Sequence, residues 1–358
     1  MPVLIAGIGT AVPPHRIAQT QAAELARQYS CETPDHERVF NAVYWGTGVE
    51  TRHSVVLQAP NGDSAARQSF YGDSSPTTRD RMRKFEEEAA ALAVTAARSA
   101  LVDARIAPAK VTHLVTVSCT GFYAPGFDIA LIKQLGLSAG IARTQVGFMG
   151  CHGALNGLRV AQAFVAADPA ACVLLCAVEM CSLHHQYGWN AEKVVANSLF
   201  ADGAGAVVVM AGKAPSDALY QVVAAGSTVI PESEDAMSWR VGDHGFEMTL
   251  STRVPDLITR NLRGWLDVWL KAHGLTVPTV GSWAVHPGGP RILAAVGEAL
   301  EIDRRALAIS HSVLAEYGNM SSPTVLFILD QMRRTRAPRP WLALGFGPGL
   351  AVEALLLA

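Results

Sequence analysis

The sequence has few charged residues and no long hydrophobic run. Only 17% of its 358 residues are Asp, Glu, Lys or Arg, and the formal net charge is −2. A protein that binds nucleic acid through phosphate contacts carries a surplus of positive charge, so this class of partner is not expected. No apolar segment reaches the ~18 uninterrupted residues of a membrane-spanning helix, so no membrane span is expected either.

The N-terminus also lacks the features of a secretion signal. Residues 1–9 are apolar, but no basic region precedes them and the apolar run is short. The segment therefore predicts a first buried strand rather than a signal peptide. The six cysteines show neither Cys-x-x-Cys spacing nor the paired spacing of a disulfide framework. Reduced thiols and a cytoplasmic location are expected from this pattern.

A metal site is not indicated. Cys176, Cys181, His184 and His185 lie close together in the chain. Their spacing matches none of the common zinc patterns, and the local run resembles a strand. We therefore expect no metal ligands among these side chains.

Half of the residues are hydrophobic, which indicates a large covered interior. A chain of 358 residues exceeds one ordinary core and predicts two domains or a duplicated one. Strand-like runs alternate with helix-like runs, as in a layered α/β fold. Charges near the start of the longest helix should form a solvated face. Strands are predicted at residues 3–9, 111–119 and 172–179, and helices at 20–30, 34–45, 79–107 and 154–167.

A weak internal repeat supports duplication. Residues 200–206 and 345–349 are both rich in glycine, and each precedes an apolar strand-like run. We interpret both as turns that join two strands and close one half of the molecule. The halves are placed at residues 1–212 and 218–358, with residues 212–217 as the linker.

Cys151 is the first candidate for chemistry. It lies between Gly150 and Gly153, after an apolar segment and before a run with apolar residues at helical spacing. The start of a helix offers free backbone N–H groups and the positive end of the helix dipole. Both favour a thiolate, which is the nucleophilic form of cysteine. A buried structural thiol explains the same pattern, because most free cysteines are small buried hydrophobes.

A nucleophilic thiol needs a base and a group that orients it. His286 ends an apolar run and precedes a Gly/Pro turn, and Asn319 lies in a loop of small residues before another apolar run. Polar residues at the ends of elements converge on one site in many α/β folds. Taken singly, His286 is equally a structural histidine and Asn319 a turn residue.

Four segments occur together in a characteristic order. They are residues 150–154 (GCHGA), 286–290 (HPGGP), 318–322 (GNMSS) and 345–349 (GFGPG). The set resembles type III polyketide synthases, the chalcone-synthase-like branch of the thiolase superfamily, over nearly the whole chain. Bacterial alkylpyrone and alkylresorcinol synthases are the most similar in appearance. The resemblance implies a thiolase-like duplicated αβαβα fold and a homodimer.

The resemblance also implies a reaction. A starter acyl group from a CoA thioester or an acyl carrier protein is loaded onto Cys151. Malonyl-CoA is decarboxylated to an enolate that attacks the acyl-enzyme, and the extended chain cyclises. No metal or redox cofactor is needed, because decarboxylation supplies the carbanion. In this scheme His286 keeps Cys151 as a thiolate, and His286 and Asn319 donate hydrogen bonds to the developing enolate oxygen.

Further positions match the family's substrate cavity. Phe200 matches an aromatic gatekeeper, although ordinary core packing explains it as well. Arg52 and Arg291 are the expected replacements for the family's CoA-phosphate cations, which are not clearly matched, or they are surface residues. The loop of residues 122–125 should reach the partner's cavity and contain a cis peptide before Pro125. The remaining expected lining residues are Cys119, Thr120, Ala124, His184, Trp239, Met248 and Ser321.

The size of these lining residues predicts the starter. Small side chains at Cys119, Thr120 and Ala124 would open an apolar channel for a medium or long alkyl tail. Bulky side chains at His184 and Trp239 would leave less room for a folded aromatic product. An alkylpyrone or alkylresorcinol is therefore expected, unless the changes only reshape the cavity.

Two other functions stay open. A ketoacyl-ACP synthase III type enzyme also uses Cys, His and Asn, and it performs a single condensation. A non-catalytic partner subunit that only binds acyl groups would share the fold, although the intact set of three residues argues against it.

Overall fold

The computed structural model describes residues 1–62, 64–212 and 220–358. Most of the expected linker, and the first residues of the expected second half, lie outside the described residues. The domain boundaries therefore stay a prediction. Within the described part of the chain, no helix is long and apolar enough to cross a membrane.

A nine-stranded mixed sheet forms the frame of the molecule, in the order β11-β12-β13-β8-β1-β7-β6-β4-β5. Two short pairs, β2 with β3 and β9 with β10, lie outside it. The strands are β1 (Val3–Ala11), β2 (Arg16–Ala18), β3 (Thr51–His53), β4 (His113–Ser118), β5 (Ala142–Gly147), β6 (Cys172–Met180), β7 (Asp202–Ala211), β8 (Tyr220–Val229), β9 (Met237–Gly242), β10 (Gly245–Leu250), β11 (Ser282–Val285), β12 (Trp341–Gly347) and β13 (Ala351–Leu357).

The helices pack in layers on this frame. They are α1 (Gln19–Ser30), α2 (Pro34–Gly46), α3 (Thr78–Ala104), α4 (Phe127–Leu135), α5 (Gly153–Ala167), α6 (Ala191–Leu199), α7 (Val254–Ala272), α8 (Pro290–Leu300), α9 (Ala308–Tyr317) and α10 (Thr324–Arg334). Short 3₁₀ turns are η1 (Ala65–Arg67), η2 (Pro108–Lys110), η3 (Gly150–His152), η4 (Cys181–His184), η5 (Val277–Thr279) and η6 (Arg304–Leu307).

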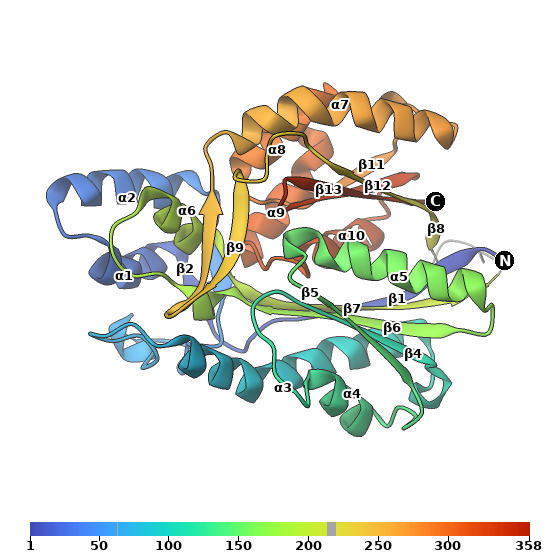
Figure 1. Ribbon diagram of the computed structural model, residues 1–358, viewed down its shortest axis with the longest axis horizontal. Helices are drawn as coiled ribbons and strands as arrows, with labels where there is room; N and C mark the ends of the chain where they lie inside the picture. Colours follow the sequence, from blue (N-terminus) through green and yellow to red (C-terminus); the bar gives the residue numbers. More distant parts are fainter. Residues whose placement is uncertain (63, 213–219) are drawn as a thin grey trace.

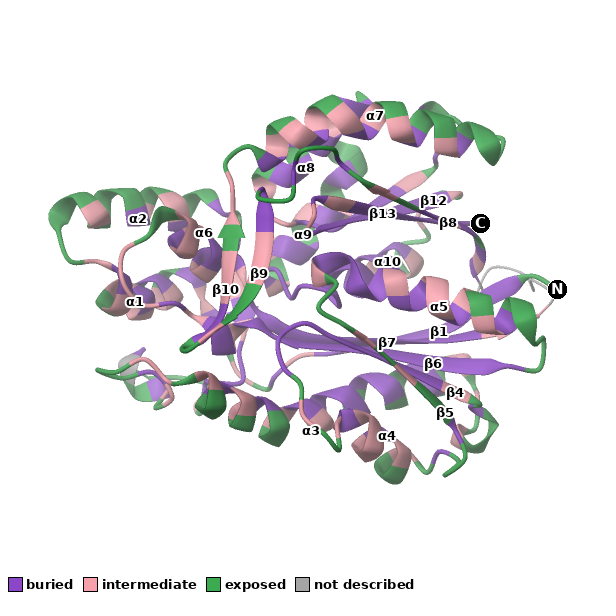
Figure 2. Ribbon diagram, viewed as in Figure 1, coloured by how far each residue is buried: buried purple, intermediate pink, exposed green. Residues whose placement is uncertain are grey.

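Figure 1 shows the order of the layers: α3 and α4, then β4, β6 and β7, then α5 and α10, then β12 and β13, then α7 and α8. Three buried apolar clusters fill the interfaces between the layers. One lies between α3 and α4 and the sheet, one surrounds α5 and α10, and one lies beneath α7 and α8. The two ends of the large sheet thus lie on opposite sides of α5 and α10. The resulting order of helix, sheet, helix, sheet and helix is the arrangement that the resemblance implies. The outer helices turn one face to solvent, and the central strands β1, β6 and β7 are buried, whereas the edge strand β5 is largely exposed (Figure 2).

The two halves repeat one pattern of elements. In the first half, β4 and β6 pair in parallel, β6 pairs antiparallel with β7, and β7 pairs antiparallel with β1. In the second half, β11 and β12 pair in parallel, β12 pairs antiparallel with β13, and β13 pairs antiparallel with β8. The buried helices α5 and α10 lead into the equivalent strands β6 and β12. This correspondence supports the predicted duplication.

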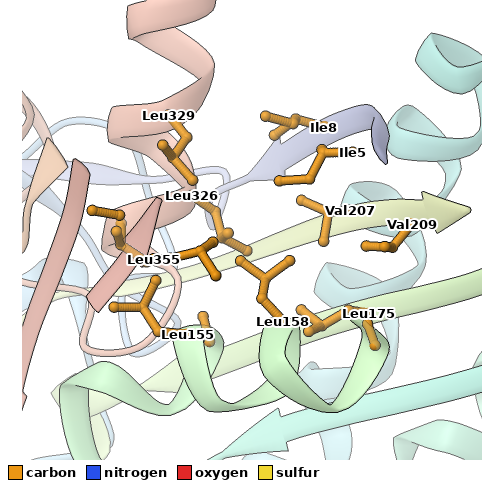
Figure 3. Close-up of a cluster of buried hydrophobic side chains, with 14 of the residues drawn as sticks. Ile5, Ile8, Leu155, Leu158, Leu175, Val207, Val209, Leu326, Leu329 and Leu355 are labelled. Carbon is orange, nitrogen blue, oxygen red and sulfur yellow. The ribbon is translucent and has the colours of Figure 1, made fainter. Parts of the chain in front are cut away.

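The central layer holds the two halves together. Leu155 and Leu158 of α5 face strand residues such as Val207, and Leu326 and Leu329 of α10 complete the cluster (Figure 3). All of these side chains are almost fully buried. Burial of one such leucine stabilises the fold by about 1.5–3 kcal/mol. The position of α5 relative to the rest of the fold, and hence of the residues at its start, depends on this packing.

The interpretation of residues 200–206 as a turn was wrong. Gly203 and Gly205 lie inside strand β7, and β6 connects to β7 through η4 and α6 instead. A Cβ atom on Gly205 would stand 2.9 Å from the Cδ1 atom of Leu326. A glycine is needed in this strand because α10 packs directly against its backbone.

The long helix also differs from its prediction. It ends at Ala104 rather than 107, because Arg105 adopts a left-handed conformation with φ 55°. Arg81 is fully buried instead of lying on a solvated face. Its guanidinium donates to the carbonyls of Leu183 and, at 3.0 Å, His185. These partners are distant in sequence, so a local charge pattern could not reveal them.

Candidate active site

Three residues from different elements meet at one small cavity of about 20 Å³. Cys151, His286 and Asn319 all line it, together with Phe200 and Met248. Cys151 lies in η3 at the start of α5, His286 directly follows β11, and Asn319 lies between α9 and α10. The structure therefore brings together the three residues that the sequence singles out for chemistry.

The backbone around Cys151 depends on glycine. Phe148 and Gly150 have φ angles of 57° and 80°, so the chain turns sharply before the helix. A Cβ atom on Gly150 would collide with the Cδ atom of Pro348. The glycine-rich segment that ends β12 therefore packs against this turn and fixes the position of Cys151.

Asn319 is held by both its backbone and its side chain. Its backbone N–H donates to the Leu199 carbonyl at 2.9 Å, and its carbonyl accepts from the Ala201 N–H at 2.9 Å. Its side-chain oxygen accepts from the backbone N–H of Ser321 at 2.8 Å. Because that partner is a donor, the side-chain NH₂ group is left for Cys151, whose pKa the Asn319 side chain lowers.

His286 is buried, and neither of its ring nitrogens has a hydrogen-bond partner among the described residues. Its backbone N–H donates to the Leu344 carbonyl at 2.8 Å, which fixes the start of the turn. Burial, and secondarily the nearby His152, lowers the pKa of His286 to about 3. The imidazole of this cavity-lining residue is therefore neutral, with one N–H donor and one free acceptor.

The pKa of Cys151 departs from the expectation for a helix N-terminus. Burial raises the pKa of the Cys151 thiol to about 12, and the carboxylate of Glu179 adds to the rise. Hydrogen bonds from Ser321 and Asn319 lower the pKa without offsetting the burial. In the free protein these shifts favour a neutral thiol and a neutral imidazole, and the thiolate paired with His286 stays a prediction.

Glu179 is a site residue that sequence reasoning missed. Its buried carboxylate accepts from the Cys119 N–H at 2.9 Å, the Thr120 hydroxyl at 2.7 Å and the Ser322 hydroxyl at 2.6 Å. Burial still raises its pKa to about 7, although these bonds lower it. The available signal was one acidic residue at the end of an otherwise apolar strand, where a charge needs partners.

The cavity wall contains most of the other expected residues. A second cavity of about 20 Å³ is lined by Cys151, Phe200, Cys119, Thr120, Trp239, Met248 and Ser321. A larger one of about 110 Å³ lies beyond Phe200, Met248 and Trp239, and His184 lines it as well. The expected lining residues are thus shared among adjoining cavities, except for Ala124.

His184 and Trp239 are fixed in place. The Nε2 of His184 donates to the Thr120 carbonyl at 2.7 Å, and its Nδ1 accepts from the Phe246 N–H at 2.9 Å. The Nε1 of Trp239 donates to the Cys119 carbonyl at 2.7 Å. These bonds hold two large rings in the wall, as the sequence led us to expect from their size.

Three expected residues lie away from these cavities or are used differently. Ala124 is on an exposed loop, and its bond to Pro125 is cis, which confirms that prediction. Arg291 is exposed near the start of α8. Arg52 is buried and donates to the carbonyls of Ser198 at 2.5 Å and Phe200 at 2.9 Å.

Both Nη atoms of Arg52 donate to groups within the chain, and the side chain is buried, so they are not available to bind a CoA phosphate. Its expected role was wrong, because the carbonyl partners lie in α6 and directly after it and cannot be seen in the local sequence. Arg291 stays a candidate for that role. No group of three or more His, Cys, Asp or Glu side chains that could hold a metal ion occurs in the described part of the chain.

Comparison with known proteins identifies the family. The profile for the N-terminal domain of chalcone and stilbene synthases matches residues 2–213, and that for their C-terminal domain matches residues 221–358. The chain is 35% identical to 1,3,6,8-tetrahydroxynaphthalene synthase of Streptomyces peucetius subsp. caesius, over 99% of this chain and 92% of that protein. It is 32% identical to the alpha-pyrone synthesis polyketide synthase-like Pks18 of Mycobacterium tuberculosis, over 99% and 90%.

Solved structures of type III polyketide synthases resemble this chain over its whole length. PKS-I of the brown alga Ectocarpus siliculosus superposes with a TM-score of 0.93 at 31% identity, covering 99% of this chain and 98% of that one. The C-terminal type III polyketide synthase domain of Steely1 from Dictyostelium gives 0.91 at 28% identity, covering 100% and 99%. The predicted thiolase-like duplicated αβαβα fold is confirmed. The chain belongs to the chalcone and stilbene synthase family, the type III polyketide synthases, which are acyltransferases acting on CoA thioesters.

Proposed function

We propose that this synthase loads a medium- or long-chain fatty acyl starter onto Cys151 and extends it with malonyl-CoA. The extended chain then cyclises to an alkylpyrone or alkylresorcinol. The observation that carries the proposal is the meeting of Cys151, His286 and Asn319 at one buried cavity. The relative from Mycobacterium tuberculosis, named for alpha-pyrone synthesis, favours the pyrone.

Loading of the starter begins from a neutral Cys151 thiol and a neutral His286 imidazole. The free acceptor nitrogen of His286 takes the Cys151 proton as the sulfur attacks the thioester carbonyl of the starter. The C–S bond to the carrier thiol then breaks, and the proton on His286 passes to that leaving thiolate. A neutral His286 suits this role, because an imidazolium could not accept the proton.

Chain extension uses two hydrogen-bond donors, Asn319 and His286. When the bound malonyl group loses CO₂, the electron pair of the broken C–C bond stays on the remaining thioester, which becomes an enolate. The Asn319 NH₂ and the His286 N–H donate hydrogen bonds to its oxygen, and the enolate carbon attacks the acyl-enzyme carbonyl. The bond to Cys151 breaks and expels the cysteine sulfur as a thiolate, and the extended chain is left as a CoA thioester. That thiolate can attack the CoA thioester and take up the longer chain for the next round, releasing the CoA thiolate. Asparagine stays neutral, whereas an aspartate would repel the enolate.

We also propose a cytoplasmic homodimer. The loop that carries Ala124 borders a cluster of exposed apolar side chains, with Phe122 at 52%, Phe148 at 38% and Met149 at 39% exposed. Exposed apolar patches on a soluble surface are commonly interfaces. A partner molecule on this face would cover them and bring Ala124 toward the neighbouring cavity.

Product analysis tests the proposed function. Purified protein is incubated with dodecanoyl-CoA and malonyl-CoA, and the products are identified by mass spectrometry. We expect tri- or tetraketides with the dodecanoyl carbon skeleton. A single condensation would instead indicate a ketoacyl-ACP synthase III type reaction, and turnover confined to malonyl or small aromatic starters would exclude the fatty starter. A carrier-protein thioester of the same acyl group, run in parallel, shows which form delivers the starter.

A further inference from the structure

A hairpin outside the large sheet forms part of the cavity wall at Cys151. Strands β9 and β10 make a separate two-stranded sheet (Figure 2). Met237, Trp239 and Met248 of these strands line one of the cavities that Cys151 lines. An isolated two-stranded hairpin is marginally stable in water, so its position depends on contacts with the rest of the protein. We call residues 237–250 the wall hairpin.

The first residue of α3 holds the tip of the wall hairpin. The backbone N–H of Thr78 donates to the Asp243 carbonyl at 2.8 Å. The Thr78 hydroxyl donates to the Gly242 carbonyl and accepts from the Gly245 N–H at 2.8 Å. Three hydrogen bonds therefore join one threonine of α3 to the turn between β9 and β10.

Arg81, one turn further along α3, lies against the same tip. A Cβ atom on Gly245 would stand 2.8 Å from the Cδ atom of Arg81. The guanidinium is fully buried, and it donates to the Pro76 carbonyl and the Ser75 hydroxyl, both at 3.0 Å. Burying a charge among uncharged groups is costly unless its donors are hydrogen-bonded. The position of Arg81 is therefore fixed by its partners.

The same guanidinium holds the segment around His184. The Nη1 of Arg81 donates to the carbonyls of Leu183 and, at 3.0 Å, His185. These two residues flank His184 in the chain, so its backbone is held on both sides. A side chain without donors at position 81 would leave both carbonyls without this partner.

The ring of His184 connects the wall hairpin to the opposite side of the cavity. Its Nδ1 accepts from the Phe246 N–H at 2.9 Å, and its Nε2 donates to the Thr120 carbonyl at 2.7 Å. Only a neutral imidazole has one acceptor and one donor. Burial lowers the pKa of His184 to about 3, and the nearby charge of Arg81 adds to the fall. Arg81 thus supports both the position and the neutral form of this ring.

We propose that Arg81 and Thr78 are positioning residues that hold the wall hairpin in place and so keep the growing chain at Cys151. The inference rests on the proposed chain extension and not on the identity of the starter. Each condensation leaves a CoA thioester, which must return to the Cys151 thiolate before the next round. A wall that is no longer held would allow this thioester to leave early.

The loading step should not depend on these two residues. The backbones of Asn319 and His286 are hydrogen-bonded to other segments of the chain, next to β7 and in β12. A change at Arg81 or Thr78 should therefore leave acylation of Cys151 intact and increase early release. A general loss of structure would lower both.

The test compares two methionine variants on one helix. Arg81→Met removes the buried donors, and Arg83→Met makes the same change at an exposed position. The readouts are the rate of Cys151 acylation and the ratio of early-released CoA thioesters to the main product, both by mass spectrometry. We expect Arg81→Met to raise the ratio about fivefold, as for the loss of one ordinary hydrogen bond, at an unchanged acylation rate. Arg83→Met should match the wild type in both.

Further variants keep the test decisive if Arg81→Met does not fold. Thr78→Val removes only a hydroxyl group and should raise the ratio as well. Thr95→Val, at an exposed position where the hydroxyl binds only the Ala91 carbonyl of the same helix, should not. Arg81→Lys retains the charge and part of the donors, so its ratio should lie closer to that of the wild type than the ratio of Arg81→Met.

A wild-type ratio in folded Arg81→Met and Thr78→Val would overturn the inference. Equal losses of acylation and extension would do the same, because they would mean that the two residues only stabilise the fold. The starter in these assays is the thioester that the wild type extends. If dodecanoyl-CoA is not extended, the proposed fatty starter is contradicted, whereas this test proceeds with another starter.

Discussion

At the scale of single residues, the site consists of groups that burial keeps neutral. Cys151 has a pKa raised to about 12 and His286 a pKa lowered to about 3, both mainly because water is excluded. A neutral pair costs less to bury than a charged one. We therefore expect the Cys151 thiol to be unreactive in the free protein and to become nucleophilic when a thioester binds.

Asn319→Ala should separate the two half-reactions. In the proposed mechanism its NH₂ donates to the enolate oxygen, so we expect malonyl-CoA decarboxylation to fall by about 10²–10³. Acyl transfer to Cys151 should fall much less. Release of CO₂ and acylation of the protein are measured in parallel. Asn261→Ala on α7, where the amide binds only the Leu257 carbonyl at 2.8 Å, is the control. Equal losses in both half-reactions would contradict the assignment.

Glu179→Gln should lower the pKa of Cys151, because the Glu179 carboxylate raises it. Less alkaline solution would then suffice to form the thiolate. The rate of alkylation of Cys151 by iodoacetamide, followed against pH, should show its midpoint at lower pH than in the wild type. Asp202→Asn removes another buried carboxylate, which is not among the main causes of the Cys151 shift, and should move the midpoint much less. An unchanged midpoint in Glu179→Gln would show that its charge is not felt at the sulfur.

The same variant carries a stability prediction. Folding raises the pKa of Glu179 from 4.5 to about 7, so the native state binds a proton that the unfolded state has released. The free energy of unfolding should therefore fall as pH rises from about 4.5 to 7, by up to about 3 kcal/mol from this group. Urea unfolding across this range should show a smaller fall in Glu179→Gln than in the wild type. Parallel curves would contradict the shift.

At the scale of secondary-structure elements, glycines determine how closely the segments of the site approach. Gly150 has both a φ of 80° and the ring of Pro348 against it, whereas Gly136 has a φ of 72° at the end of α4 and open space around it. Comparing these two positions separates backbone strain from steric contact.

Gly136→Ala should cost about 1 kcal/mol of unfolding free energy, which is the penalty for a left-handed alanine. Gly150→Ala should cost about 1–3 kcal/mol more, because Pro348 must also move. Urea denaturation of both variants measures the difference. Equal losses would mean that the segment after β12 does not press on the Cys151 turn.

The sequence predicted the positions of the candidate site residues better than it predicted the roles of the buried arginines. Hydrophobic periodicity and the order of the four motifs predicted that Cys151, His286 and Asn319 lie at the ends of secondary-structure elements. In the structure these ends meet at one cavity. The roles of Arg81 and Arg52 were missed because their partners are backbone carbonyls far along the chain. A buried charge depends on tertiary contacts, and hydrophobic periodicity carries no information about them.

At the scale of the whole molecule, the proposed dimer contact is a cluster of exposed apolar side chains at one edge of the large sheet. Strand β5 ends the large sheet, and Phe122, Phe148 and Met149 are exposed beside it. Phe148→Glu should place a charge in this face and convert a dimer to monomers in sedimentation experiments. Val268→Glu, at a 73% exposed position on α7, should remain dimeric. A wild-type monomer at micromolar concentration would contradict the proposed assembly.

The central claim is that Cys151 carries the acyl chain while His286 and Asn319 act on it. The most direct measurement is peptide mass spectrometry after brief incubation with dodecanoyl-CoA, followed by malonyl-CoA. We predict a dodecanoyl group on the peptide of Cys151, its loss as polyketide product forms, and neither event in Cys151→Ala. An acyl group found on Cys119 or Cys181, or continued product formation by Cys151→Ala, would contradict the account.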